Sequence, residues 1–268
     1  MITAAYEGEH PLTPLSEGVF STLSASQRNL YIDRAIRNGN FSVARALNEE
    51  EAKILFRQGS IVKLARHSLR RHGVVQYQRL AELEHVGHLS DDTATELGGL
   101  YSEIGQTLST VLAMRRVIKD DRSNFDYDRY TALTGVSTEL TFLALLSKGG
   151  SLSPFIPLPA LGDEDKSDLQ GTARLNGIDL TVVDTPTQAS EARLQIKTSD
   201  RFKSKSYIRS VTKISLQEIS TMVPDGIYEL PHAVVSDASG AGSNRDDEFV
   251  TAAKHELYKK INDNLHRR

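Results

Sequence analysis

The chain contains no cysteine among its 268 residues. This absence excludes disulfide bonds, zinc sites built from thiolates and cysteine nucleophiles, and it suits a cytoplasmic protein in a reducing compartment. The chain also lacks any run of about 18 apolar residues, so we expect no membrane-spanning helix. Its first residues show no basic stretch followed by an apolar one, so we expect no secretory signal.

The chain also has no large excess of positive or of negative charge. The net charge is −3, so the whole chain has no basic field that would attract nucleic acid, and any basic surface must be local. Hydrophobic residues make up 39% of the chain and charged residues 25%, which is typical of a folded globular protein rather than a disordered one. The length allows one or two domains.

The first half of the chain has a helical pattern of hydrophobic residues. Residues 1–25 contain prolines, serines and glycines and are predicted to form an irregular arm, whereas residues 26–128 are predicted to be a helical region. Ser24 or Ser26 is expected to cap the first helix and Ser90 the last. The charged segment 119–129 marks the predicted domain boundary. The remaining helices of this region are expected at 48–72, 74–86 and 90–118.

The second half, residues 129–268, mixes helical and strand patterns. Three prolines at 154, 157 and 159 exclude a central strand at that point. The order of elements predicts an α/β domain, a class that binds ligands at the ends of its strands. We expect helices at 129–148, 213–222 and 246–264, and strands at 172–176, 178–184, 191–198 and 231–236.

Two of the predicted strands carry a pattern of residues suited to binding a divalent cation. Asp179 lies on the first of them, and Gln195 and Lys197 lie on the second. Residues two apart on a strand share a face, so Gln195 and Lys197 lie together while Ile196 points the other way. A carboxylate, an amide oxygen and the backbone carbonyl of Ile196 suit magnesium, and the lysine suits orientation of a water molecule.

A further acid lies on the helix predicted at 129–148. Glu139 falls at the centre of its apolar face, between hydrophobic positions such as Val136 and Leu143. A carboxylate in such a position is costly unless it is paired or bound to a cation. Glu139 is therefore a candidate second metal-binding acid.

These pieces together resemble the PD-(D/E)XK nuclease superfamily, the fold of many restriction endonucleases and Holliday junction resolvases. The resemblance covers residues 129–237 and is carried by the helix 134–140, the strand 177–180 and the segment 194–199. It implies a restriction-endonuclease-like domain in which a helix is followed by a mixed central sheet of about four strands with flanking helices.

The resemblance also implies an activity, which is magnesium-dependent cleavage of DNA, with manganese as a possible substitute. By the resemblance, Asp179 is the metal-binding acid, Glu139 the helix acid, Gln195 stands at the variable acid position and Lys197 is the family lysine. Because glutamine replaces the usual acid, the site has one negative charge fewer. Many nucleases of this class act as homodimers, and a role in restriction or defence would fit.

Other assignments stay open from the residues alone. Asp184 or Asp168 replaces Asp179 as the metal-binding acid if the register of the strands differs. A basic stretch without acids follows the motif and is a candidate for contacts with phosphate, although an ordinary exposed loop explains it equally well. Its residues are Arg201, Lys203, Lys205, Arg209 and Lys213.

Two rival functions also stay open. Arg66 and His72 have a spacing that resembles that of the HEPN ribonucleases, although a basic solvated helix face explains them more simply. Alternatively, the chain is a catalytically inactive member of the nuclease fold that binds nucleic acid or has a structural role, with Lys197 paired to Glu139 in a site without metal.

Overall fold

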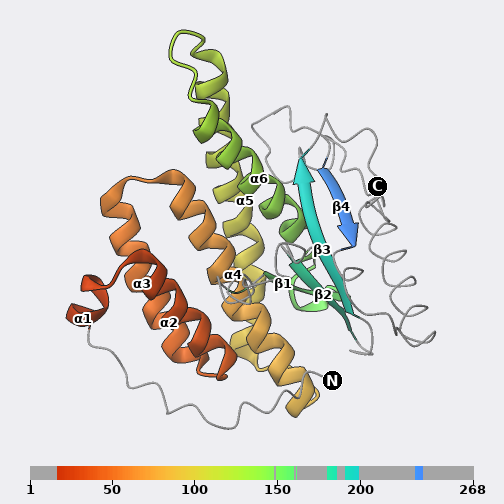
Figure 1. Cartoon of the computed structure of the whole chain (residues 1–268). Coiled ribbons are helices and arrows are strands. Elements are labelled where there is room, and N and C mark those ends of the chain that lie inside the picture. The colour runs from red at the N-terminus through yellow and green to blue at the C-terminus, as the bar shows by residue number, and fades with distance from the viewer. Residues whose placement is uncertain are drawn as a thin grey trace, which may run out of the picture.

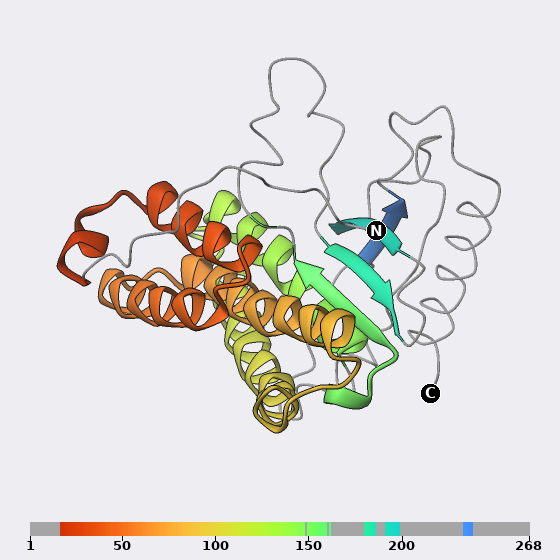
Figure 2. The same ribbon diagram turned by 90° about the horizontal axis from the view of Figure 1, so that it is seen from below.

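The structure is a computed structural model, and it describes residues 17–147, 149–159, 161, 180–185, 191–198 and 233–237. For the last two ranges the description is of the backbone. Helices dominate this part of the chain, and a small sheet lies beside them (Figures 1 and 2). The α-helices are α1 (Glu17–Thr22), α2 (Ala25–Arg37), α3 (Phe41–Gln58), α4 (Ile61–His85), α5 (Asp91–Asp120) and α6 (Tyr127–Leu146), and a short 3₁₀ helix, Gly150–Leu152, follows.

The helix starts follow local capping chemistry. Ser24 caps α2, and its hydroxyl accepts from the backbone N–H of Gln27 while the Gln27 side chain accepts from the backbone N–H of Ser24. Ser90 caps α5 by accepting from the backbone N–H of Thr93, and acids fill the first turn. Both predicted caps are confirmed.

The boundary between α3 and α4 differs from the prediction. Helix α3 ends at Gly59, which has the left-handed backbone (φ +65°) that glycine adopts without strain. Helix α4 then runs without a break through Gly73 to His85. The predicted helices at 48–72 and 74–86 were therefore divided at the wrong glycine.

Glu82, in the last turn of α4, holds the start of α5. Its carboxylate accepts from the backbone N–H of Ser90 at 2.9 Å and from the hydroxyl of Thr93 at 2.7 Å. These hydrogen bonds lower the pKa of Glu82 in spite of its partial desolvation. A negative charge is favourable at a helix N-terminus, so this contact fixes the turn between the two helices.

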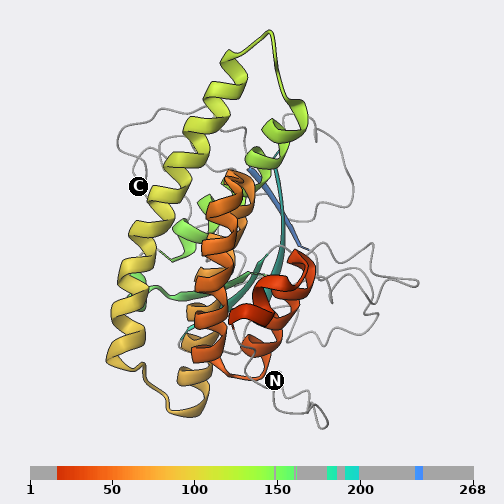
Figure 3. The ribbon, with the colours of Figure 1, turned by 90° about the vertical axis from the view of Figure 1, so that its left-hand side faces the viewer.

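Helices α5 and α6 form a long antiparallel hairpin whose tip extends beyond the rest of the described chain (Figure 3). From Leu133 onward helix α6 is buried on most sides, and the buried residues include hydroxyl side chains such as Ser137 and Thr141. Its residues Leu133, Leu140 and Leu143 belong to the main core cluster, together with residues of α4, α5 and the first two strands. The core is therefore continuous across the loop at 121–126.

In the part of the chain that the structure describes, the sheet has four strands in the order β1-β2-β3-β4, and every neighbouring pair is antiparallel. Strand β1 lies at the edge, in agreement with the exclusion of a central strand by its prolines. The predicted strand at 191–198 is found with its predicted bounds, and β2 and β4 fall at the predicted strands 178–184 and 231–236. The bounds are β1 (Phe155–Pro159), β2 (Leu180–Asp184), β3 (Glu191–Thr198) and β4 (Ala233–Asp237).

The predicted fold class was wrong. The described part of the chain is mostly helical, whereas the prediction was a helical N-terminal region followed by a restriction-endonuclease-like domain with a mixed central sheet of about four strands. Its strand pairings are all antiparallel, and β1 and β2 are the only two strands for which side-chain packing is described. The error has a physical reason. A pattern of hydrophobic residues indicates which face of a strand is buried but not whether neighbouring strands run parallel or antiparallel. In addition, most of the core comes from the helical residues 26–146.

Helix α4 attaches the sheet to the helices. Gly73 packs against Pro159 of β1, with room for a Cβ atom at 3.6 Å from the proline ring. Arg79, which is only 2% exposed, donates to the backbone carbonyls of Ser151, Ser153 and Phe155. One guanidinium thus satisfies three carbonyls of the connection between α6 and β1. Within the described residues, no helix has both the length and the hydrophobicity to cross a bilayer.

Candidate functional site

The register of β2 and β3 determines which residues of the predicted motif are neighbours. Leu180, the first residue of β2, pairs with Leu194. Asp179, which directly precedes Leu180 in the chain, lies outside the described residues. Gln195 directly follows Leu194, and together with Ile196 and Lys197 it continues β3 past this last β2 pair.

Beyond Leu194, strand β3 pairs with β4 only, as far as the chain is described. Gln195 is opposite Ser236, and Lys197 is opposite Val234. The β2 side of this part of β3 is thus free of any described strand partner. Within the described residues, the β2–β3 pairing is therefore seen up to Leu180 and Leu194, the neighbours in the chain of Asp179 and Gln195.

The same register separates Asp184 from the motif. Asp184 is the last residue of β2, four positions from Leu180, and is therefore about 13 Å along the strand from the pair that precedes Gln195. Its side chain is also buried, and it lies opposite Phe155 of β1. Of the three candidate acids, Asp184 is thus at the end of β2 that is far from Gln195, and Asp168, like Asp179, lies outside the described residues.

Glu139 is half-buried on α6, and α6 contacts β3. Leu180 and Val182 belong to the same buried cluster as the core residues of α6, whereas Val183 belongs to a second cluster with Leu80 of α4. Thr181 pairs with Arg193, so by backbone alternation positions 195 and 197 belong to the face of Thr181 and Val183. The described residues therefore do not show Glu139 converging with these positions.

The other predicted site residues are separated from this motif. The basic segment from Arg201 to Lys213 lies outside the described residues. Arg66 is exposed on α4, but His72 is only 1% exposed, with its Nε2 3.0 Å from the hydroxyl of Ser147. Burial, together with the charge of Arg79, lowers the pKa of His72 to about 3. Arg66 and His72 therefore do not share a solvent-accessible site.

Among the described residues, no group of three or more His, Asp or Glu side chains is placed to hold a metal ion. The predicted set contains only two carboxylates, Glu139 and Asp179, and the second lies outside this part of the chain. Neither family models, nor the curated proteins, nor the solved structures give a match to this chain. Function must therefore be argued from the chain itself.

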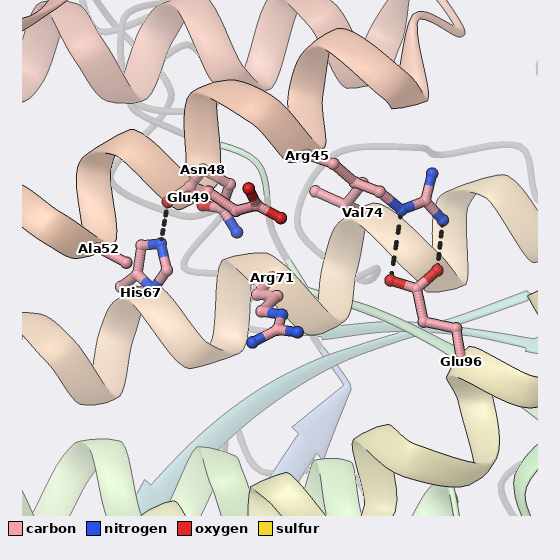
Figure 4. A pocket seen from close by; sticks show the side chains of 8 residues that line it. All are labelled: Arg45, Asn48, Glu49, Ala52, His67, Arg71, Val74 and Glu96. Atoms are coloured by element: carbon pink, nitrogen blue, oxygen red, sulfur yellow. Dashed lines mark hydrogen bonds and ion pairs between the residues drawn. The ribbon is translucent and has the colours of Figure 1, made fainter.

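The structure also contains a polar cavity that the sequence reading did not identify. It lies between α3 and α4, with one residue from α5 (Figure 4), and has a volume of about 70 Å³. Asn48 forms part of its wall and is buried within the apolar stripe of α3. A polar residue at a hydrophobic position of the helical repeat was the available signal.

Glu51 lies one turn further along the same buried stripe as Asn48, and the two residues differ in whether their buried polar groups have a partner. Glu51 forms a buried ion pair with Arg28, so its burial is explained by a partner of opposite charge. The side-chain oxygen of Asn48 is buried without any hydrogen-bond partner. Asn48 is therefore the residue in α3 whose burial is not explained by the core.

Proposed function

We propose that this protein is a metal-dependent nuclease that hydrolyses phosphodiester bonds in DNA through Asp179, Gln195 and Lys197. The observation that carries the proposal is the register of β2 and β3, in which the residue after Asp179 pairs with the residue before Gln195. This register favours Asp179 over Asp184. The proposal rests on the local strand motif and not on the fold of the restriction endonucleases.

The residue types of this motif suit a hard divalent cation. The carboxylate of Asp179, the amide oxygen of Gln195 and the backbone carbonyl of Ile196 are oxygen ligands of the kind that magnesium and manganese take. A cation bound there would supply charge neutralisation at the scissile phosphate. Lys197 would orient the attacking water, because its ammonium donates hydrogen bonds without competing for the cation.

Glutamine in place of the usual acid makes a specific difference to this site. Gln195 contributes an oxygen but no negative charge, so the site binds a cation less tightly than one with an additional carboxylate. Glu139 supplies the missing charge only if α6 and the end of β3 allow it to approach. A Glu139→Ala variant therefore tests the contribution of α6 separately from that of the strand motif.

The proposed substrate follows from charge. The segment with Arg201, Lys203, Lys205, Arg209 and Lys213 follows β3 directly and carries no acid, so it can contact phosphates beside the cleaved bond. A homodimer would allow both strands of a duplex to be cut. We do not propose a ribonuclease centred on His72, since that side chain is buried against Ser147 and Gln76.

The test is a cleavage assay with the full chain on supercoiled plasmid and single-stranded DNA, with magnesium, manganese or a chelator. We expect cation-dependent cleavage that falls by about 100-fold or more in Asp179→Ala and in Lys197→Ala, because each removes charge stabilisation at the reacting phosphate. Lys63→Ala, an exposed lysine on α4, is the matched control and should cleave at the wild-type rate.

Two outcomes would overturn the proposal. One is cleavage that persists unchanged in Lys197→Ala, which would show that the activity arises elsewhere or from a contaminant. The other is no cleavage with either cation by a folded protein. In that second case, binding of DNA that is unaffected by Asp179→Ala would support the catalytically inactive alternative.

A further inference from the structure

The tip of the α5–α6 hairpin, residues 116–129, carries a large share of the exposed apolar side chains. Seven large hydrophobic side chains are exposed among the described residues, and three of them lie in this short segment. They are Val117 (63% exposed), Phe125 (43%) and Tyr127 (58%). Figure 3 shows the tip projecting past the other described elements. Exposed apolar side chains that gather in one place are typical of surfaces that contact another molecule.

The aromatic rings of the tip form one cluster that is anchored to the protein interior. The ring centre of Phe125 lies 6.4 Å from that of Tyr127 and 5.4 Å from that of Tyr130. The buried Arg115 donates to the hydroxyl of Tyr130 at 3.1 Å, and its guanidinium lies 5.0 Å from the centre of the same ring. A buried cation therefore fixes the inner ring, while Phe125 and Tyr127 stay exposed.

The loop that joins the two helices is held by its own carboxylates. Asp121 accepts from the hydroxyl of Ser123 at 2.8 Å and from the backbone N–H of Asn124 at 3.1 Å. Asp126 accepts from the backbone N–H of Arg129 at 2.9 Å, which caps the start of α6. A loop that is ordered in advance loses less conformational entropy when it binds a partner.

The charges of the tip indicate the kind of partner. Four basic and four acidic residues cancel, and they are Arg116, Lys119, Arg122 and Arg129, and Asp120, Asp121, Asp126 and Asp128. A surface without excess positive charge does not attract a phosphate backbone or an anionic membrane. Arg116 pairs with Asp120 on α5. Arg122, Asp128 and Arg129 are exposed and form no ion pair with another described residue.

We propose that the hairpin tip is a self-association surface that binds the tip of a second copy of this chain. Two copies related by a twofold axis present the same patch to each other, so a basic residue of one copy faces an acidic residue of the other. The rings of Phe125 and Tyr127 pack at the centre, and charges such as Arg122 and Asp128 pair across the rim. The tip does not include the strand motif, so this proposal is independent of the nuclease proposal.

The test is sedimentation velocity of the full chain, without divalent cation or DNA, at concentrations from about 1 μM to about 500 μM. The patch contains only three large apolar side chains, so the interface belongs among the small, transient ones. We therefore expect a reversible dimer with a Kd of about 10–100 μM.

Variants at the two exposed rings test the centre of the interface. Phe125→Ser and Tyr127→Ser should each weaken the dimer by about tenfold or more, because aromatic side chains at the centre carry most of the binding energy. Phe56→Ser on α3 is the matched control. Phe56 is 78% exposed, so its replacement removes as much exposed apolar surface elsewhere, and this variant should dimerise as the wild type does.

A charge exchange tests the twofold arrangement. Arg122→Asp and Asp128→Arg should each weaken self-association by about tenfold, because like charges then meet across the axis. An equal mixture of these two variants should associate about as tightly as the wild type, since opposite charges face each other again. Arg57→Asp, the same reversal at an exposed position of α3, is the control and should dimerise as the wild type does.

The proposal is overturned if the wild type stays monomeric up to about 500 μM, well above the expected Kd. It is also overturned if Phe125→Ser and Tyr127→Ser both dimerise with unchanged affinity, which would place the interface on another surface. An equal loss in Phe56→Ser would show unspecific association of apolar side chains. A monomer whose binding to anionic vesicles or to DNA is lost in Phe125→Ser would show that the tip takes a different partner.

Discussion

Acid should destabilise this protein through one buried histidine. His72 lies inside the contact between α4 and the end of α6, where its Nε2 is 3.0 Å from both the Ser147 hydroxyl and the Gln76 amide nitrogen. Burial is the main reason that its pKa falls from 6.5 to about 3, and the positive charge of Arg79 adds to the shift. The native protein therefore holds this ring uncharged.

The sign and size of the effect follow from proton linkage. In the unfolded chain the ring takes up a proton as the pH falls through 6.5, whereas in the native protein it does so only near pH 3. The unfolded state thus binds more protons in this interval, so stability falls as the pH is lowered. Between about pH 7.5 and about pH 5, His72 should cost about 2 kcal/mol of unfolding free energy.

Urea unfolding followed by circular dichroism at these two pH values measures the effect. The wild type should lose about 2 kcal/mol more than His72→Gln, whose side chain does not titrate. His67 shifts in the same direction but is present in both proteins, so its contribution cancels. The lowered pKa of Glu82 acts only at more acidic pH, because its ordinary value is 4.5.

His88→Gln, at an exposed position, is the control and should behave as the wild type does. The reasoning would be refuted if wild type and His72→Gln lost the same free energy between the two pH values. A second measurement does not depend on the variant folding well. The NMR signals of the His72 ring should stay at their neutral positions down to about pH 5.

Two further predictions concern the contact between α4 and β1. Arg79→Met should lower the unfolding free energy by about 3 kcal/mol or more, because the buried carbonyls of Ser153 and Phe155 and the partly buried one of Ser151 lose a charged donor; a loss below about 1 kcal/mol in urea would contradict it. Gly73→Ala should raise stability by about 0.5–1 kcal/mol, since the new Cβ meets Pro159 at an ordinary 3.6 Å, whereas Gly73→Leu should lower it by about 1–3 kcal/mol through overpacking. Equal thermal midpoints for the two glycine variants would show that this contact is not close.

The features that sequence predicted well are those with local causes. Ser24 or Ser26 was expected to cap one helix and Ser90 another, and Ser24 and Ser90 do so through backbone groups three residues away. The strand at 191–198 was predicted with its observed ends. In each case the residues that decide the structure are neighbours in the chain, so one segment contains the necessary information.

The errors have causes that are distant in the chain. Gly59 and Gly73 look alike in the helical pattern, but α3 stops at the first and α4 passes through the second. The difference is that Gly73 packs against Pro159 of β1, a contact that the sequence around Gly73 does not reveal. The antiparallel pairing of β3 with β4 was missed for a similar reason, since residues 199–232 separate them and permit either direction.

The candidate strand site was predictable in part. The residue types and the order of the two strands were visible in the sequence, but the choice between Asp179 and Asp184 required the register. The polar cavity between α3 and α4 was not predictable in the same way. Its walls come from three helices, so no single segment of the sequence contains it.

The contact made by Glu82 has a consequence for the order in which the chain folds. Its partners, Ser90 and Thr93, are only eight and eleven residues away, so the loop that must close is short and its entropic cost is small. We expect the turn between α4 and α5 to form early, before the sheet strands find partners that are much farther along the chain. This helical pair would then serve as the template on which α6 and β1 assemble.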